Sequence, residues 1–342
     1  MPTKYEKRLG SLYGIALGDA MGMPSEGMHP DDIAALFGRI DRLLHSPASL
    51  PKRMREMGRS PRDMLPGEVT DDTETSVIVA EMLIANQGKV NPTDFVHRLQ
   101  AWVDRYSEKA MLVCGPSTKR ALAALKDGMP LDKAGRFGDS NGSIMKVLPV
   151  GLVNDYHDMP ELIEQVYQLC LPTHNTSLAV SGAAAVAAVA SYAVYCDRFV
   201  WDEAWSMAIQ AAELGAQKGH WCWGRTMHCA LLHTKEVMDG LIARGADESQ
   251  VLKVLFEDIG TGLPCAETGC AAIAIAYYAD GDPRYAAILG ANVGADTDTV
   301  ASIAAGICGA IRGIDFIPSQ ERDILERVNH LKFSVLAQGL NI

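Results

Sequence analysis

The run from Leu178 to Cys196 contains no charged residue and is long enough to cross a membrane as a helix. It consists mostly of Ala, Ser, Gly and Val, which gain little free energy on transfer into lipid. Side chains this small also allow neighbouring helices to approach closely. We therefore expect a close-packed core helix here, and no membrane partner.

The rest of the sequence is dominated by helical periodicity. Apolar residues recur with a helical period over residues 6–20, 72–85, 92–106, 117–126, 159–171, 177–195, 201–217, 267–278 and 297–311. Strand-like alternation is scarce, and neither a repeat nor a linker divides the chain. The sequence predicts an all-α protein, a compact single-domain orthogonal many-helix bundle over residues 1–342.

Charge and cysteine content exclude several classes of protein. The formal net charge of -11 opposes attraction to phosphodiester backbones, so we expect no nucleic-acid partner. Eight cysteines without a Cys-x-x-Cys pair fit neither a disulfide scaffold nor a zinc ribbon. The first ten residues lack the apolar core of a signal peptide. These features together predict a cytoplasmic protein with reduced thiols.

Three acidic clusters lie at predicted helix boundaries. They are residues 18–26 (Gly-Asp-Ala-Met-Gly-Met-Pro-Ser-Glu), 70–76 (Thr-Asp-Asp-Thr-Glu-Thr-Ser) and 294–299 (Gly-Ala-Asp-Thr-Asp-Thr). Helix capping is the default interpretation of any one of them, because Asp and Thr satisfy free backbone N–H groups. A cap requires one acid, however, whereas Asp71/Asp72 and Asp296/Asp298 place two carboxylates at the start of each apolar helix. Burying four carboxylates is costly unless cations neutralise them.

The residue types in these clusters indicate which cations they could bind. Oxygen ligands from Asp, Glu and Thr suit hard divalent ions such as Mg²⁺, Mn²⁺ or Ca²⁺ and do not suit zinc. Two such ions could activate a bridging water and polarise a sugar oxygen, with a nearby carboxylate as general base. The clusters therefore predict a binuclear metal site, with capping as the alternative.

Two further segments could contact a substrate. Residues 135–146 are rich in glycine and small polar residues, and exposed N–H groups in such a loop can hold phosphate oxygens, although an ordinary turn is the alternative. His174 precedes the alanine-rich helix, where a histidine is usually structural. Residues 38–67 break the helical pattern and carry seven Arg and Lys residues. They predict a long basic loop, which we interpret as a solvated insertion rather than a receptor for a phosphorylated substrate.

Taken in order, these segments resemble the ADP-ribosylglycohydrolase family over nearly the whole chain. The resemblance rests on five motifs: Gly18-Asp19 with Glu26, Thr70-Asp71-Asp72-Thr73, Asn141-Gly142-Ser143 with Met145, Thr173-His174, and Asp296-Thr297-Asp298-Thr299. It implies hydrolysis at the anomeric carbon of a ribose, through an oxocarbenium-like transition state that nearby carboxylates would stabilise.

The resemblance also implies roles for individual residues. Two Mg²⁺ (or Mn²⁺) ions would be held by Thr70, Asp71, Asp72, Asp296, Asp298 and Thr299. The general base would be one of Glu26, Asp71, Asp72 and Asp296. The ADP-ribose phosphates, ribose and adenine would be bound by Phe137, Gly138, Ser140, Asn141, Gly142, Ser143 and His174.

Two departures from the family pattern bear on the substrate. Lys146 stands where many members have arginine, and Asp139 adds a negative charge to the phosphate loop. The expected substrate is an ADP-ribosylated protein, with arginine as the modified side chain, and both departures favour the alternative of a nucleosidase-like enzyme for a small ribosyl N-glycoside. A crystallin-like binding protein and a phosphate-ester hydrolase are further alternatives.

Overall fold

Glycines recur every fourth residue along the first helix, and they determine how the centre of the protein packs. The helix α1 (Lys4–Gly22) presents to α17 (Thr297–Arg312) the residues Gly10, Gly14, Gly18 and Gly22. In this computed structural model, a Cβ atom added at Gly18 would lie 2.1 Å from the carbonyl oxygen of Ala301. The two helices run antiparallel with their backbones in contact, which a side chain at these positions would prevent.

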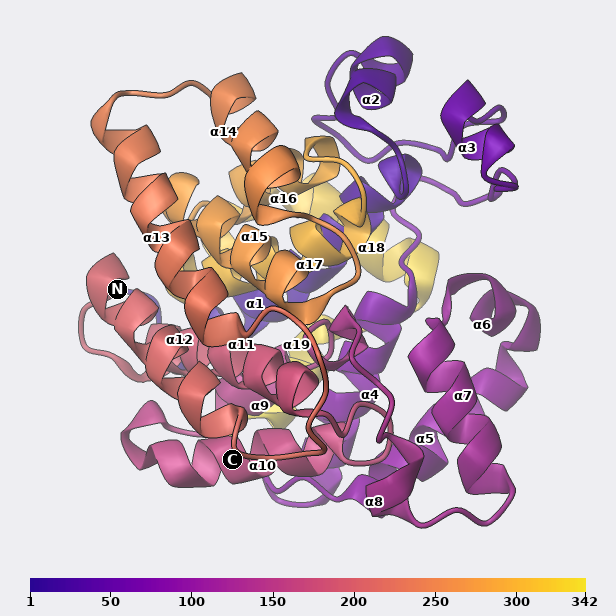
Figure 1. The fold of residues 1–342 in the computed structure, drawn as a ribbon, viewed down its shortest axis with the longest axis vertical. Coiled ribbons are helices and arrows are strands. Elements are labelled where there is room, and N and C mark those ends of the chain that lie inside the picture. Colours follow the sequence, from indigo (N-terminus) through magenta and orange to yellow (C-terminus); the bar gives the residue numbers. More distant parts are fainter.

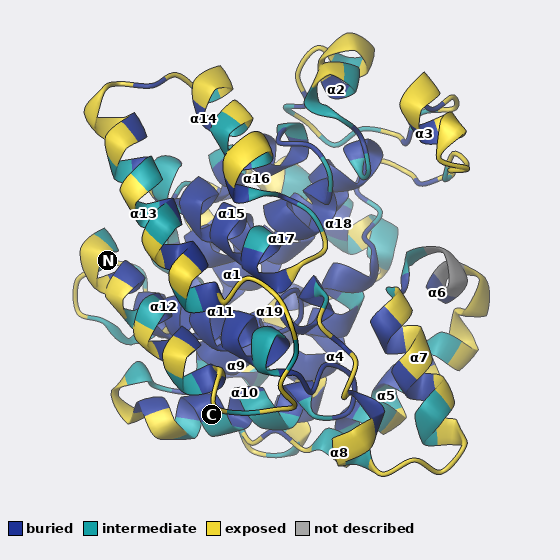
Figure 2. Cartoon of the chain, in the orientation of Figure 1, coloured by how far each residue is buried: buried dark blue, intermediate teal, exposed yellow. Residues whose placement is uncertain are grey.

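Three more helices enclose this pair. They are α11 (Ser177–Tyr195), α15 (Cys265–Tyr278) and α16 (Pro283–Asn292), and with α1 and α17 they form the dark blue centre of Figure 2. Within the described part of the chain, α11 is the one helix long and apolar enough to span a membrane, and 89% of its apolar window is buried inside the protein. It is packed as a core helix, as its small side chains predicted.

The remaining helices cover this centre (Figure 1). They are α2 (Pro30–Phe37), α3 (Lys52–Glu56), α4 (Asp71–Ala85), α5 (Pro92–Arg105), α6 (Ser107–Val113), α7 (Pro116–Lys126), α8 (Leu131–Ala134), α9 (Leu148–Val153), α10 (Met159–Cys170), α12 (Trp201–Gly215), α13 (Met227–Ala243), α14 (Glu248–Val254), α18 (Ser319–Asn329) and α19 (Phe333–Gly339). In Figure 1, α2 and α3 project from one corner, and α5 to α8 form one flank.

The structure describes the backbone of residues 1–342 and every side chain except those of residues 109, 111 and 112. Across this backbone there is no β-strand, only two isolated bridges, Ser140 with Pro264 and Thr176 with His220. The all-α prediction is confirmed, and each of the nine predicted helices is present with both ends within two residues of the expected positions. The predicted loop at 38–67 contains only the short α3.

Candidate active site

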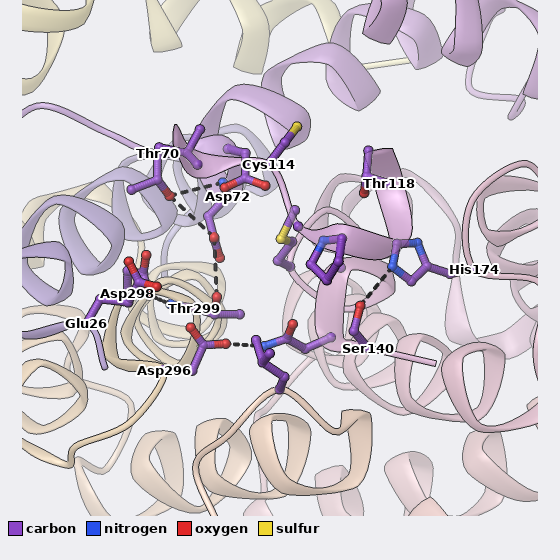
Figure 3. A pocket seen from close by; sticks show the side chains of 18 of the residues that line it. Glu26, Thr70, Asp72, Cys114, Thr118, Ser140, His174, Asp296, Asp298 and Thr299 are labelled. Atoms are coloured by element: carbon purple, nitrogen blue, oxygen red, sulfur yellow. Dashed lines mark hydrogen bonds between the residues drawn. The ribbon is translucent and has the colours of Figure 1, made fainter. Parts of the chain in front are cut away.

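Two helix N-termini meet at the site, although they are far apart in the sequence. The hydroxyl of Thr70 accepts a hydrogen bond from the Asp72 N–H and so caps α4, and Asp296 precedes α17. The hydroxyl of Thr299 donates to the Asp72 carboxylate at 3.3 Å, across 227 residues of chain. Figure 3 shows this contact between the two helix starts. The structure therefore brings the second and third acidic clusters together.

A pair of backbone hydrogen bonds holds the first cluster against the third. The Gly27 N–H donates to the Ala295 carbonyl at 2.7 Å, and the Ala295 N–H donates to the Met28 carbonyl at 2.9 Å. Ala295 adopts a φ of 60°, which is unusual for a residue other than glycine and turns the chain into α17. Glu26 consequently contributes one carboxylate oxygen to a group with Asp296 and Asp298 in which all ligand atoms lie within 4.8 Å of one another.

Asp19, on α1, holds the start of α4 in place, although it was not among the predicted site residues. It is fully buried on α1 and accepts hydrogen bonds from the backbone N–H groups of Thr70 and Thr73 and from the Thr73 hydroxyl. Burial raises the pKa of Asp19 to about 6, against the effect of these hydrogen bonds. Asp19 thus caps α4 from another helix and fixes where Asp71 and Asp72 lie.

The carboxylates of the site repel one another in the absence of cations. Burial and the charge of Asp19 raise the pKa of Asp71 to about 7, and burial and the charge of Glu26 raise the pKa of Asp296 to about 6. The pKa of Asp72 lies well above its ordinary value, mainly through burial, and its Oδ1 atom is buried with no hydrogen-bond partner in the described part of the chain. An oxygen-only set with excess negative charge and an unpaired acceptor fits divalent cations.

These carboxylates line one wall of a cavity of about 190 Å³. The wall includes all the predicted metal ligands: Thr70, Asp71, Asp72, Asp296, Asp298 and Thr299. The predicted substrate residues Ser140, Asn141, Gly142 and His174 also line this cavity, and Figure 3 shows Ser140 and His174 on the side opposite Glu26 and Asp298. A second cavity of about 970 Å³ shares Pro116, Ser140 and Leu263 with the first and is lined by Phe137. The two cavities therefore adjoin along one groove.

The glycine-rich loop is bound directly to the acidic wall. The Asn141 side-chain amide donates to Asp296 and, at 3.0 Å, to the Thr268 hydroxyl. Ser140 lies 3.2 Å from His174 Nε2, so these two side chains are also held together. The loop and the acidic cluster consequently form a single hydrogen-bonded unit rather than two separate sites.

Two predicted substrate residues do not line either cavity. The Ser143 hydroxyl donates to the Ala179 carbonyl at 3.1 Å and faces the interior. Gly138 lies against the Thr173 backbone, where an added Cβ would be 2.2 Å from the carbonyl oxygen. In the arrangement seen here, Ser143 and Gly138 shape the loop while Ser140, Asn141 and Gly142 present it to the groove.

Comparison with known proteins adds the decisive observation. A sequence model described as ADP-ribosylglycohydrolase matches residues 1–341. The chain belongs to the ADP-ribosylglycohydrolase family. As a member of this family it is a hydrolase that acts on ADP-ribosyl glycosidic bonds.

Several relatives align over most of this chain. It is 33% identical to the uncharacterized protein YegU of Escherichia coli K12, over 98% of this chain and 97% of that protein. It is 24% identical to the ADP-ribosyl-[dinitrogen reductase] glycohydrolase of Rhodospirillum rubrum, over 93% and 90%. A solved structure titled ADP-ribosylglycohydrolase-related protein complex superposes with a TM-score of 0.65 at 21% identity, over 99% and 98% of the two chains, and therefore supports the fold.

Lys146, one of the two departures from the family pattern, lies behind the loop and lines neither cavity. Its ammonium donates to the Gly142 carbonyl and lies 3.5 Å from both the Thr173 hydroxyl and His174 Nδ1. Burial lowers the pKa of Lys146 to about 8. Burial and the Lys146 charge hold the pKa of His174 well below its usual range. His174 is therefore a neutral ring that supports Ser140.

The basic loop contributes two residues to the candidate active site that were not among the predicted site residues. Arg62 donates to the Glu26 carboxylate, and Arg59 lies 3.8 Å from it. Both line the smaller cavity. We favoured a solvated insertion for this loop, but its end is part of the cavity wall. The charge excess of the loop was the only signal in the sequence.

Proposed function

We propose that the protein hydrolyses the anomeric bond between an ADP-ribosyl group and its acceptor, with two Mg²⁺ or Mn²⁺ ions held by Thr70, Asp71, Asp72, Asp296, Asp298 and Thr299. The observation that carries the proposal is the buried, unpaired Asp72 Oδ1 in an oxygen-only cluster that faces a glycine-rich loop across one cavity. When bound, the cations would supply Lewis acidity toward water and ribose hydroxyls.

The side chains around the cluster support this reaction. The carboxylates of Glu26, Asp71, Asp72 and Asp296 lie at the cavity wall, where one of them can take a proton from the attacking water. Their negative charge also stabilises the positive charge that develops on the ribose ring in the transition state.

The proposed orientation of the substrate follows from the groove. The terminal ribose would lie in the smaller cavity beside the acidic cluster, with the phosphates against Ser140, Asn141 and Gly142. The adenosine part would extend into the larger cavity past Phe137. The acceptor would then leave on the side of Glu26, which lies opposite Ser140 and His174 in Figure 3.

Mass spectrometry of reaction products tests the proposal. The purified protein is incubated with Mg²⁺ or Mn²⁺, and separately with chelator, against ADP-ribosylated peptides carrying different acceptors and against a panel of nucleosides. Free ADP-ribose that is lost in chelator and in Asp298→Asn, and retained in the exposed control Asp127→Asn, supports the proposal.

Other outcomes of this experiment decide between the alternatives. Release of base from nucleosides alone would replace the proposal with a ribosyl N-glycosidase. Full activity in chelator would remove the two cations from the mechanism. Tight binding of ADP-ribose without turnover of any substrate would indicate a binding protein.

A further inference from the structure

Two guanidinium groups lie at the Glu26 end of the smaller cavity, and the proposed mechanism does not use them. Arg62 and Glu26 are both largely buried, with 18% and 17% of their side-chain surfaces exposed, and they form a direct charge-assisted hydrogen bond. Arg59 is half exposed and lies 3.8 Å from the other oxygen of Glu26. Both arginines line the cavity with Asp296 and Asp298.

Glu26 fixes the Arg62 guanidinium without using all of its donors. A guanidinium has five N–H donors, and among the described residues Arg62 makes one hydrogen bond, from Nη1 to Glu26. The remaining donors, together with those of Arg59, belong to residues that line the cavity. This arrangement is a preorganised donor group beside the reacting centre.

The position of the arginines relative to the substrate follows from the proposed function, on which this inference rests. If the ADP-ribose phosphates lie against the loop of Ser140 and Gly142, the acceptor would lie on the side of Glu26, which is opposite Ser140 in Figure 3. Arg59 and Arg62, which both pair with Glu26, would then lie on the side of the leaving group. Their charge acts on whatever charge develops on the leaving atom.

We propose that Arg59 and Arg62 select an acceptor that departs as an oxyanion, a carboxylate or a phosphate, rather than a guanidinium. In the hydrolysis, the water oxygen bonds to the anomeric carbon and the bond from that carbon to the leaving oxygen breaks. The electron pair remains on the leaving oxygen, and the proton of the water passes to a carboxylate of the site. Negative charge therefore develops where the two guanidinium groups can donate hydrogen bonds.

An arginine acceptor has the opposite electrostatics. The modified guanidinium is itself cationic, so Arg59 and Arg62 repel it both in the bound state and as it leaves. The two arginines consequently favour an acyl or phosphoryl acceptor over an arginine acceptor in the same active site.

The test compares three substrates under identical conditions with Mn²⁺: ADP-ribose ester-linked to a glutamate peptide, ADP-ribose 1″-phosphate, and ADP-ribosyl-arginine peptide. We expect higher kcat/KM for the first two, and the better of them identifies the source of the oxyanion. Arg62→Gln should lower kcat for both by about 10²- to 10³-fold, the usual loss for one oxyanion donor, with a smaller loss in Arg59→Gln. The loss on ADP-ribosyl-arginine should be smaller than the loss on either of the other two substrates in both variants.

Controls separate this role from a structural one. Arg42→Gln removes the same charge from the same loop, but Arg42 is 71% exposed, pairs with Asp41 and lines neither cavity. It should behave as the wild type. Circular dichroism and thermal unfolding establish that the cavity variants are folded. Across acyl acceptors of increasing pKa, kcat should fall more steeply in Arg62→Gln, because the leaving oxygen then carries its charge unassisted.

Three results would overturn the inference. A higher kcat/KM for ADP-ribosyl-arginine would overturn the selectivity while leaving the proposed function intact. Equal losses on all three substrates in folded Arg62→Gln would show that Arg62 acts only by holding Glu26. Release of no ADP-ribose from any substrate would overturn the proposed function, and this inference with it.

Discussion

Thr73, in the first turn of α4, donates from both its backbone N–H at 3.0 Å and its hydroxyl at 2.6 Å to the same carboxylate oxygen of Asp19. The helix that begins with two proposed metal ligands is therefore capped by a carboxylate from a different helix. Because α1 also contacts α17 backbone to backbone, Asp19 relates the start of α4 to the start of α17.

We expect Asp19→Asn to lower the free energy of unfolding by about 1–3 kcal/mol when Mn²⁺ is saturating, because an amide cannot accept all of these hydrogen bonds and leaves a buried donor unpaired. Cation affinity should fall as well. Chemical denaturation and calorimetric titration with Mn²⁺ measure the two effects. Ser11→Ala is the control, since the buried Ser11 hydroxyl on the same helix has no partner among the described residues and its loss should not destabilise the protein. Unchanged Mn²⁺ affinity in Asp19→Asn would contradict the role of Asp19.

Gly18→Ala tests the contact between α1 and α17. The added Cβ would lie 2.1 Å from the Ala301 carbonyl oxygen, so the helices must separate, at a cost of about 3 kcal/mol. Gly240→Ala, on α13, meets no atom within 4 Å and should instead stabilise the protein by about 1 kcal/mol. Urea unfolding of both variants distinguishes a packing effect from the general helix propensity of alanine. Equal stabilisation by both would disprove the close contact.

Removal of cations should make stability fall as pH rises. The Asp71 pKa is raised from 3.8 to about 7, so its favourable contribution is complete below about pH 4 and is lost as pH rises through 7. In chelator we expect the melting temperature to decline between pH 4 and 7. Addition of Mn²⁺ at pH 7 should raise it again, because Mn²⁺ at a concentration of one hundred times its Kd adds about 2.7 kcal/mol to the free energy of unfolding. Asp298→Asn should be more stable than wild type in chelator and respond weakly to Mn²⁺. A melting temperature indifferent to Mn²⁺ would count against a cation site.

Lys146 predicts the opposite dependence in alkaline solution. Its pKa is lowered from 10.5 to about 8, so the buried ammonium destabilises the folded state fully below pH 8, and this cost is relieved as pH rises to 10.5. At each pH, the free energy of unfolding of Lys146→Met is compared with that of wild type. The value for the variant relative to wild type should be higher at pH 7 than at pH 10.5, by on the order of 3 kcal/mol. Paired urea titrations across this range measure it. A difference independent of pH would mean that the Lys146 pKa is the same in the folded and unfolded states, so that burial does not lower it.

Most of the long helices could be predicted because their determinants are local, although the 17-residue α13 was not predicted. Asn91 before Pro92 and Thr176 before Ser177 cap their helices, and apolar runs follow. The shorter α18 was not predicted either, since Leu325 is its one fully buried residue and few apolar residues mark its buried face. The four-residue spacing of glycines in α1 was visible in the sequence and indicates the contact with α17, which we did not predict.

The supporting residues of the site could not be predicted from local pattern. Asp19 meets Thr73 across 54 residues, and Arg62 meets Glu26 across 36, and neither pairing has a fixed sequence spacing. The charge of the 38–67 loop was visible in the sequence, but we interpreted it as a solvated insertion, and no sequence pattern pairs Arg62 with Glu26. The proposed metal ligands were easier to find because two acids at one helix start already demand an explanation beyond capping.

The antiparallel packing of α1 on α17 also governs when the site can form during synthesis. The glycines of α1 leave the ribosome early, but the backbone that they contact is among the last parts of the chain to be synthesised. The hydrogen bond from Thr299 to Asp72 likewise forms only after 227 further residues have been added. A nascent chain that lacks α17 has exposed helix backbone and half a ligand set. If the proposed cations bind, they would reach full affinity only after synthesis is nearly finished, so their retention would show that both ends of the chain have docked.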